Sequence, residues 1–220
     1  MARTRRQQLV MLQREVRACN RCVGSGHLTE AHPVSWGPVV GRNMVVGQAP
    51  AQRAHLSERP WSGPSGRLMR TWFVRAGFDP DRFYDDWYFT SLTKCFPGKA
   101  ASGNGDRAPS ATERALCRPF LDTEIRVIQP PLVIALGRQA AEALIPGARK
   151  MTLRDLVGSI HTVDLGYGDV PVLPLPHPSG VGRWLNDAEN RALVDRAMYL
   201  LAELVGNPVE PEPSHRLTAP

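Results

Sequence analysis

Hydrophobic residues follow two different rhythms along this chain of 220 residues. Short apolar runs occur near residues 44–46, 87–92, 132–136 and 172–175, each bounded by glycine, proline or polar residues. Runs of this length that are rich in β-branched or aromatic residues predict buried strands. Between them, apolar residues return every three or four positions, which predicts amphipathic helices.

Four longer helices and one short helix follow from this spacing. Their expected core-facing residues are Leu9, Leu12, Val16 and Cys19 in the first, Leu68, Met69, Trp72, Phe73 and Ala76 in the second, and Leu193, Ala197, Leu200, Leu201 and Leu204 in the last; the short helix covers residues 138–144. Ser110 and Glu113 form a capping box that opens the third helix, which Pro119 should start, kink or break. The last helix should begin at Asn186, with Glu189 in its cap.

Strands that alternate with helices predict the α/β class. We expect a three-layer α/β/α sandwich with a central, mostly parallel four-stranded sheet and helices on both faces. With 42% hydrophobic residues, the chain has enough apolar surface for one core. Residues 1–206 are therefore expected to form a single domain, and the Pro/Glu-rich residues 207–220 a disordered tail.

The net charge gives a modest indication of the binding partner. The net charge of +6 and the pI near 9.5 favour a polyanionic partner such as nucleic acid, although many basic proteins bind none. No apolar run approaches the roughly 18 residues that cross a bilayer. The basic residues 3–6 are not followed by the apolar segment of a signal peptide. We expect a cytoplasmic monomer that has no membrane partner.

The four cysteines are candidates for a metal centre. Cys19 and Cys22 are separated by two residues, which lets both sulfurs bind one centre, and Cys95 and Cys117 can complete the set. Thiolates suit either zinc or an iron–sulfur cluster, and spacing alone does not choose between them. Four ordinary buried thiols are the simpler alternative. A bound centre would clamp the N-terminal helix and the 96–117 loop to the body of the protein.

Two turns at strand ends carry the candidate chemistry. Residues 47–50 follow the first strand, and residues 174–180 contain His177 within a run of small residues and prolines. Ligands of open parallel sheets bind outside the carboxyl ends of the strands. We therefore expect both turns to face one pocket.

An ordered set of motifs then resembles a known family. The motifs are Cys19-x-x-Cys22, Gly47-Gln48-Ala49-Pro50, Arg59-Pro60-Trp61-Ser62-Gly63, Thr90-Ser91-Leu92-Thr93-Lys94-Cys95, Cys117-Arg118-Pro119-Phe120-Leu121, Val133-Ile134-Ala135-Leu136-Gly137 and His177-Pro178-Ser179. Together they resemble the uracil-DNA glycosylase superfamily, in particular its iron–sulfur families four and five. The resemblance covers about residues 17–201. It implies that the four cysteines hold a structural 4Fe-4S cluster, with zinc as the alternative.

The resemblance also assigns roles to individual residues. It implies that His177 donates a hydrogen bond to uracil O2 and stabilises the departing anion, although a histidine can also simply cap a loop. The turn of Gly47, Gln48, Ala49 and Pro50 should present backbone N–H groups to the base. Trp61 should stack on the everted base, although a tryptophan more often belongs to a core.

This chain departs from the family at three positions. Ala49 stands where the best-known family has a water-activating aspartate, and Gln48 stands where family four has a glutamate. Ser91 replaces an asparagine that reads uracil, and a serine cannot make that bidentate contact. The resemblance therefore implies a less selective pocket, more like that of family five. His55 is a fallback for positioning the attacking water.

DNA binding requires phosphate contacts and a group that fills the vacated stack. Ser179, Val181 and Arg183 follow the histidine motif, where the superfamily inserts a loop into the minor groove, and Lys94 is a further phosphate contact. The resemblance implies a monofunctional DNA repair glycosylase that acts on uracil, or on other deaminated bases, in DNA. A non-catalytic module that binds damaged DNA is the alternative, and a zinc-stabilised protein that handles free nucleotides is a lesser one.

Overall fold

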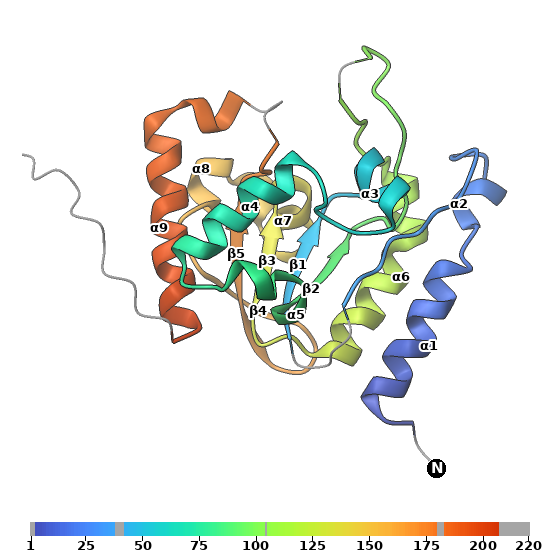
Figure 1. The fold of residues 1–220 in the computed structure, drawn as a ribbon, viewed down its shortest axis with the longest axis horizontal. Helices are drawn as coiled ribbons and strands as arrows, with labels where there is room; N and C mark the ends of the chain where they lie inside the picture. The colour runs from blue at the N-terminus through green and yellow to red at the C-terminus, as the bar shows by residue number, and fades with distance from the viewer. Residues whose placement is uncertain (1–2, 38–41, 104, 180–182, 207–220) are drawn as a thin grey trace, which may run out of the picture.

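Five strands form one sheet in the order β2-β1-β3-β5-β4 in the computed structural model, which describes residues 3–37, 42–103, 105–179 and 183–206. The strands are β1 (Asn43–Gly47), β2 (Trp87–Ser91), β3 (Val133–Leu136), β4 (His161–Asp164) and β5 (Asp169–Leu175) (Figure 1). Neighbouring strands among β2, β1, β3 and β5 are parallel. These four are the strands that the short apolar runs predicted.

The strand β4 was missed, so the expected four-stranded sheet is wrong by one strand. It pairs antiparallel with the first half of β5 at the edge of the sheet, with Val163 opposite Val170. Only Val163 of β4 is buried. An edge strand that covers so little of the core carries neither a continuous nor an alternating apolar pattern.

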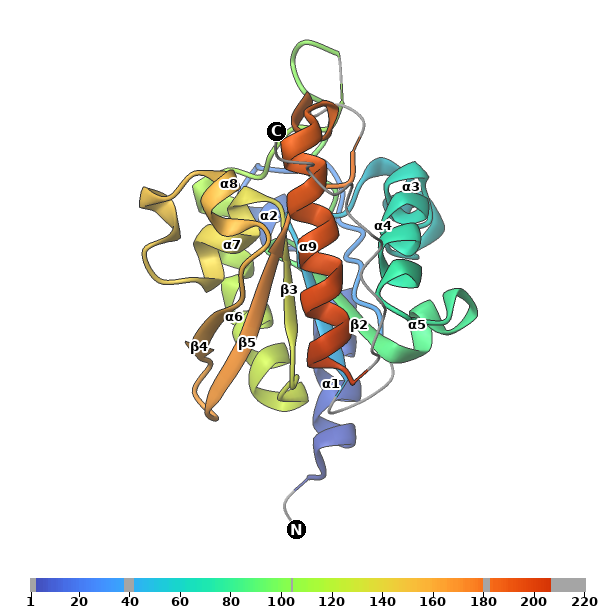
Figure 2. The ribbon, with the colours of Figure 1, turned by 90° about the vertical axis from the view of Figure 1, so that its left-hand side faces the viewer.

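Helices cover both faces of the sheet (Figure 2). The longer ones are α1 (Arg5–Arg17), α4 (Pro64–Arg75), α6 (Ala111–Ile128), α7 (Arg138–Leu144) and α9 (Ala188–Leu204). The shorter ones are α2 (Arg21–Gly24), α3 (Gln52–Ser57), α5 (Phe83–Asp86) and α8 (Leu153–Leu156), with 3-10 turns at Pro80–Arg82, Ala148–Lys150 and Arg183–Asn186. No described helix combines the length and apolarity needed to cross a membrane.

Alternating strand residues supply the two cores. Met44 and Val46 of β1 belong to the core beneath α1, α6 and α7, whereas Val45 belongs to the core beneath α4 and α9. All three are fully buried. A parallel strand covered on both sides needs apolar residues at every position, which is why its sequence is a continuous run. The predicted three-layer α/β/α sandwich is confirmed.

The helix α6 continues through Pro119 from Ala111 to Ile128, so the expectation that Pro119 starts or breaks the helix is wrong. Its capping box forms as predicted: Ser110 Oγ accepts from Glu113 N, and the Glu113 carboxylate accepts from Ser110 N at 2.7 Å. Proline removes one helical hydrogen bond and crowds the preceding turn. Phe120 and Leu121, both buried in the core, hold the chain in the helix across this position.

The helix α9 begins two residues later than predicted. Asp187 is its N-cap and accepts a hydrogen bond from Glu189 N at 2.9 Å, while Asn186 belongs to the preceding 3-10 turn. Its buried apolar residues are Val194, Ala197, Met198, Leu201 and Ala202. Leu204, expected in the core, is exposed. The predicted disordered tail, residues 207–220, lies outside the described part of the chain.

Candidate active site and cysteine centre

A cavity of about 130 Å³ opens at the carboxyl edge of the parallel strands. Ala49 and Pro50 follow β1, Ser91 ends β2, and His177 lies two residues beyond β5; all four line this cavity, together with Trp61. Parallel strands bring these distant segments together because their carboxyl ends lie at the same sheet edge. The expectation that both turns face one pocket is confirmed.

The turn after β1 is anchored through its carbonyl groups. Leu92 N donates to Gly47 O at 2.9 Å, and Thr93 N donates to Gln48 O at 3.3 Å. These bonds extend the pairing of β1 and β2 past the end of both strands and hold residues 47–50 in place. The half-buried side chain of Gln48 is not among the groups that line the cavity.

Trp61 is held in an unusual backbone conformation beside the cavity. Its φ is +56°, in the left-handed region that non-glycine residues rarely adopt. A Cβ added to Gly66 would lie 1.7 Å from the Trp61 carbonyl oxygen, and one added to Gly47 would lie 3.2 Å from Trp61 Cζ2. The lack of a side chain at Gly47 therefore leaves room for the indole.

His177 faces Trp61 across the cavity. The ring centroids are 5.8 Å apart and the rings are inclined by 46°. Burial lowers the pKa of His177, and the charge of Asp106 raises it in opposition. The imidazole is therefore neutral at neutral pH, with one nitrogen that donates a hydrogen bond and one that accepts.

The described lining of this cavity contains no aspartate or glutamate. Its polar side chains are His177, Arg53 and the hydroxyl groups of Ser62, Ser65, Thr90 and Ser91. Sequence reasoning did not single out Arg53 or Phe89 as lining residues. Phe89 is hidden within an apolar strand, and Arg53 belongs to a helix of six residues that is too short for a periodic pattern.

The structure does not bring His55 into the cavity. His55 lies on α3, whose residues Arg53 and Ala54 line the cavity, but its own Nε2 lies 3.2 Å from Glu30 Oε1. The expected role of His55 in positioning water therefore has no support from the lining of the cavity. The pairing with Glu30 was not visible in the sequence because 25 positions separate the two residues.

Lys94 is not on the surface, and the expectation that it contacts DNA is wrong. Its side chain is 2% exposed, and its Nζ donates to Glu124 Oε2 at 2.7 Å and to the Ser91 carbonyl at 2.8 Å. The third N–H of the Lys94 ammonium donates to Thr90 Oγ1. A buried ammonium needs such partners, because an unpaired charge in the interior is very costly.

The other predicted DNA contacts lie on the segment after β5. Ser179 is half-buried and Arg183 is exposed at the start of the turn before α9. Val181 lies outside the described residues. Arg183 is therefore accessible to a phosphate.

All four cysteines line a second, smaller cavity of about 20 Å³. Cys19 follows α1, Cys22 lies on α2, Cys95 follows β2, and Cys117 lies on α6; none forms a disulfide. The backbone N–H of Lys94 donates to Cys117 Sγ at 3.2 Å. The gathering of four thiols that the sequence predicted is confirmed.

Three of the four thiols, those of Cys22, Cys95 and Cys117, have raised pKa values. Burial, followed by the neighbouring thiols, raises the pKa of Cys95 to about 12, and burial also raises those of Cys22 and Cys117. Without a cation, these thiols stay protonated at neutral pH. A metal ion deprotonates a thiol that binds it, so the site gains its ligands only when a metal is present.

The fold and the cavity together define an α/β protein whose ligand site lies at the carboxyl edge of a parallel sheet, next to a four-cysteine centre. The chain belongs to the uracil DNA glycosylase superfamily, because the model of that family matches residues 34–201. This match begins in the loop before β1 and ends in α9, so it includes every residue that lines the cavity.

Curated relatives match over most of their length. The chain is 25% identical to a Type-4 uracil-DNA glycosylase of Sulfurisphaera tokodaii, with 91% of this chain and 86% of the relative covered. It is 27% identical to the Type-4 uracil-DNA glycosylase of Thermotoga maritima, with 80% and 84% covered. That of Pyrobaculum aerophilum is 28% identical, with 80% and 85% covered.

Proposed function

We propose that this protein is a monofunctional DNA repair glycosylase that everts uracil from DNA and hydrolyses its glycosidic bond, leaving an abasic site. The observation that carries the proposal is the cavity shared by His177, Trp61 and the turn after β1. The relatives named as Type-4 uracil-DNA glycosylases support the choice of substrate. Everting a base costs a few kcal/mol, which contacts in a fitting cavity recover.

The neutral imidazole of His177 stabilises the leaving group. As the C1′–N1 bond breaks, its electron pair leaves with the base, and negative charge develops on the uracil oxygens. A hydrogen bond from His177 to one of these oxygens strengthens as that charge grows, which lowers the barrier. Trp61 offers an aromatic face to the base and keeps water away from that side.

The attacking water needs no strong base in this scheme. No carboxylate lies in the described lining of the cavity. The bond therefore breaks before water attacks: the oxygen of water bonds to C1′ of a sugar cation already formed, and its proton passes to solvent. Ser91 offers one hydroxyl to the base, so other deaminated bases are accepted beside uracil.

Basic residues around the cavity hold the DNA backbone. Arg53 lies at the rim and Arg183 follows the histidine segment, and both are exposed. We assign phosphate contacts to them, together with Ser179, and a place in the vacated stack to Val181. Each phosphate contact makes affinity more sensitive to salt.

We further propose that the protein acts as a cytoplasmic monomer.

The four cysteines fit a 4Fe-4S cluster better than a single zinc ion. Thiolates around one tetrahedral zinc lie about 3.8 Å apart, given Zn–S bonds of about 2.3 Å. In the described residues, no three cysteine sulfurs lie within 4.8 Å of one another. Cys19, Cys22, Cys95 and Cys117 would hold the cluster, which supplies a covalent link between α2, β2 and α6.

Oligonucleotides that contain a single uracil test the proposal. The protein is incubated with duplex and single-stranded substrates, and abasic sites are revealed by cleavage with alkali; hypoxanthine and xanthine substrates follow. His177→Ala should lose most activity and keep its DNA affinity, whereas His161→Ala, on the far edge strand, should retain both. No product from any of the three bases would remove the enzymatic assignment.

A second candidate is a module that binds damaged DNA without turnover. The cavity favours it in one respect, namely the lack of a carboxylate in its described lining. Salt-sensitive binding to uracil-containing DNA without an abasic product would identify this case. Iron and sulfide analysis of the purified protein tests the cluster separately.

A further inference from the structure

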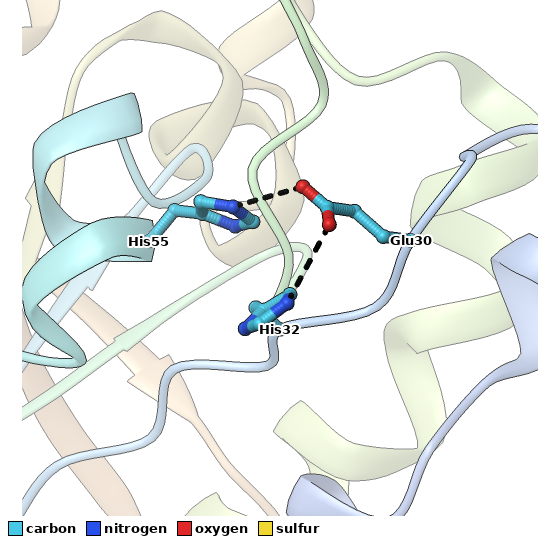
Figure 3. A group of neighbouring side chains, drawn as sticks. All are labelled: Glu30, His32 and His55. Atoms are coloured by element: carbon cyan, nitrogen blue, oxygen red, sulfur yellow. Dashed lines mark ion pairs between the residues drawn. The ribbon is translucent and has the colours of Figure 1, made fainter.

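Two histidines and a glutamate meet outside both sites described above. His55 points from α3 toward Glu30, and His32 approaches the same carboxylate from the loop that follows α2 (Figure 3). Glu30 Oε1 lies 3.2 Å from His55 Nε2, and Glu30 Oε2 lies 3.7 Å from His32 Nε2. One ligand atom from each residue lies within 4.8 Å of the other two.

The two N···O distances are close to the spacing between neighbouring ligand atoms around one bound metal ion. Bonds of about 2.0–2.1 Å to nitrogen and oxygen in tetrahedral geometry place neighbouring ligand atoms about 3.3 Å apart. The two imidazole rings stand edge to face, with centroids 4.5 Å apart, so both rings turn toward the carboxylate without stacking on each other. A small shift of side chains suffices for one ion to contact all three.

The chemistry of the ligands selects the type of ion. Two imidazoles and one carboxylate form the ligand set of His₂Glu zinc sites, which keep a fourth position for water. Imidazole also suits other late transition metals, whereas magnesium and calcium prefer oxygen ligands throughout. Cysteine does not take part, so this site differs in chemistry from the four-cysteine centre.

Solvent access allows an ion to enter. The side chains of Glu30 and His32 are 62% and 48% exposed, while that of His55 is 12% exposed and fixed by its surroundings. The Nδ1 of His55 is buried and has no hydrogen-bond partner among the described residues, so Nε2 is the nitrogen that offers a ligand atom. The cluster therefore combines one largely buried histidine with two ligands that face solvent.

We propose that Glu30, His32 and His55 form a binding site for a divalent transition metal ion, with zinc as the representative ion. The ion joins the loop that contains Glu30 and His32 to α3. That loop reaches both other sites: Ala31 and Pro33 line the cysteine cavity. Val34 lines the cavity at the sheet edge. Bound zinc would therefore fix, relative to α3, the loop that runs between the two sites.

Zinc binding to the full-length protein tests the proposal. Wild type, as purified and freed of loose metal, is titrated with zinc chloride by calorimetry. Glu30→Gln and His32→Gln should each weaken the affinity by more than about tenfold, the lower bound that even an outer partner of a ligand costs. His27→Gln removes a histidine from the same segment outside the cluster and should bind zinc as wild type does.

X-ray absorption at the zinc edge reports the ligands directly. A shell of nitrogen and oxygen near 2.0–2.1 Å is expected for this site, whereas sulfur near 2.3 Å would place the ion on the cysteines. Zinc should also raise the melting temperature of wild type but not that of the two variants. Equal affinity in Glu30→Gln and wild type, a sulfur shell, or no zinc binding at all would each overturn the proposal.

The variants are chosen so that misfolding cannot mimic the result. Glu30 and His32 are exposed, and substitutions at such positions usually change stability by less than about 0.5 kcal/mol. Equal melting temperatures of all proteins in the absence of zinc verify this. If a variant melts earlier without zinc, the absorption measurement on wild type alone decides between the imidazole and cysteine sites.

Discussion

The Lys94 ammonium lies 2.7 Å from the Glu124 carboxylate, and both side chains are almost entirely buried. The pair joins the segment that follows β2 to the C-terminal half of α6. Glu124 also accepts from the hydroxyl groups of Thr90, Tyr88 and Ser35, so both of its oxygens are occupied. Because Lys94 N also donates to Cys117 Sγ, one residue touches the cysteine centre and supports Ser91 in the cavity.

Removing one partner of this pair should destabilise the fold strongly. Lys94→Met leaves the Glu124 charge buried without its cation, which costs about 3–5 kcal/mol in the free energy of unfolding. Arg118→Met is the matched control: its partner Asp122 is exposed, and such a pair contributes at most about 1 kcal/mol. Urea unfolding followed by circular dichroism compares the two variants. Similar losses in both would contradict the assignment.

Gly66→Ala should disable the cavity through Trp61. The added Cβ would lie 1.7 Å from the Trp61 carbonyl oxygen, so the segment that carries the indole must move. We expect uracil excision to fall at least about tenfold, since small misplacements of a binding group are costly. Gly24→Ala adds the same methyl group where no atom lies within 4 Å and should keep full activity. Equal rates for both variants would show that the Trp61 position is unimportant.

Ser91→Asn should narrow the choice of base. Ser91 lines the cavity and offers one hydroxyl, whereas an asparagine offers a donor and an acceptor at once. The ratio of kcat/KM for uracil to that for hypoxanthine should rise by about tenfold or more. An asparagine that pairs with uracil is left without a hydrogen-bond partner by a base of different polar pattern, and such a base is rejected. Single-turnover rates on matched oligonucleotides measure this ratio. An unchanged ratio would place base selection elsewhere in the cavity.

Acid should weaken the fold partly through His177. Burial lowers the pKa of this histidine below its ordinary value of 6.5, so the unfolded chain binds the proton more readily than the folded protein. Stability therefore falls as the pH drops below about 6.5, and it is unaffected by this group above that value. His177→Gln lacks the titration and should lose less stability between pH 7 and pH 5.5. Parallel urea titrations at both pH values provide the comparison.

Removing metal from the cysteines should loosen the loops and leave α1 in place. Leu9, Leu12 and Val16 bury one face of α1 in the core, which holds the helix independently of any centre. After chelation, hydrogen exchange should accelerate in residues 19–34 and 93–97, but not in residues 9–16. Exchange that accelerates equally in α1 would support the view, suggested by the sequence, that the centre clamps this helix.

The chain's local pattern was enough for the four parallel strands and for the capping box of α6. The strands are buried on both faces, which requires a continuous apolar run. The capping box joins residues three positions apart. Both features therefore depend on residues that are close together in the sequence. The edge strand β4 and the path of α6 through Pro119 were not predictable in the same way. There, packing against distant segments outweighs local preference.

The sequence by itself determined which segments meet, because the turns at strand ends and the four cysteines appear as short motifs in a fixed order, and the turns share one cavity while the cysteines line another. Only the tertiary structure decided where each side chain points. It buries Lys94 against Glu124, turns His55 toward Glu30 and places Trp61 over Gly47. These relationships join residues far apart in the chain, and their energies arise from burial and charge pairing that exist only after the sheet has formed.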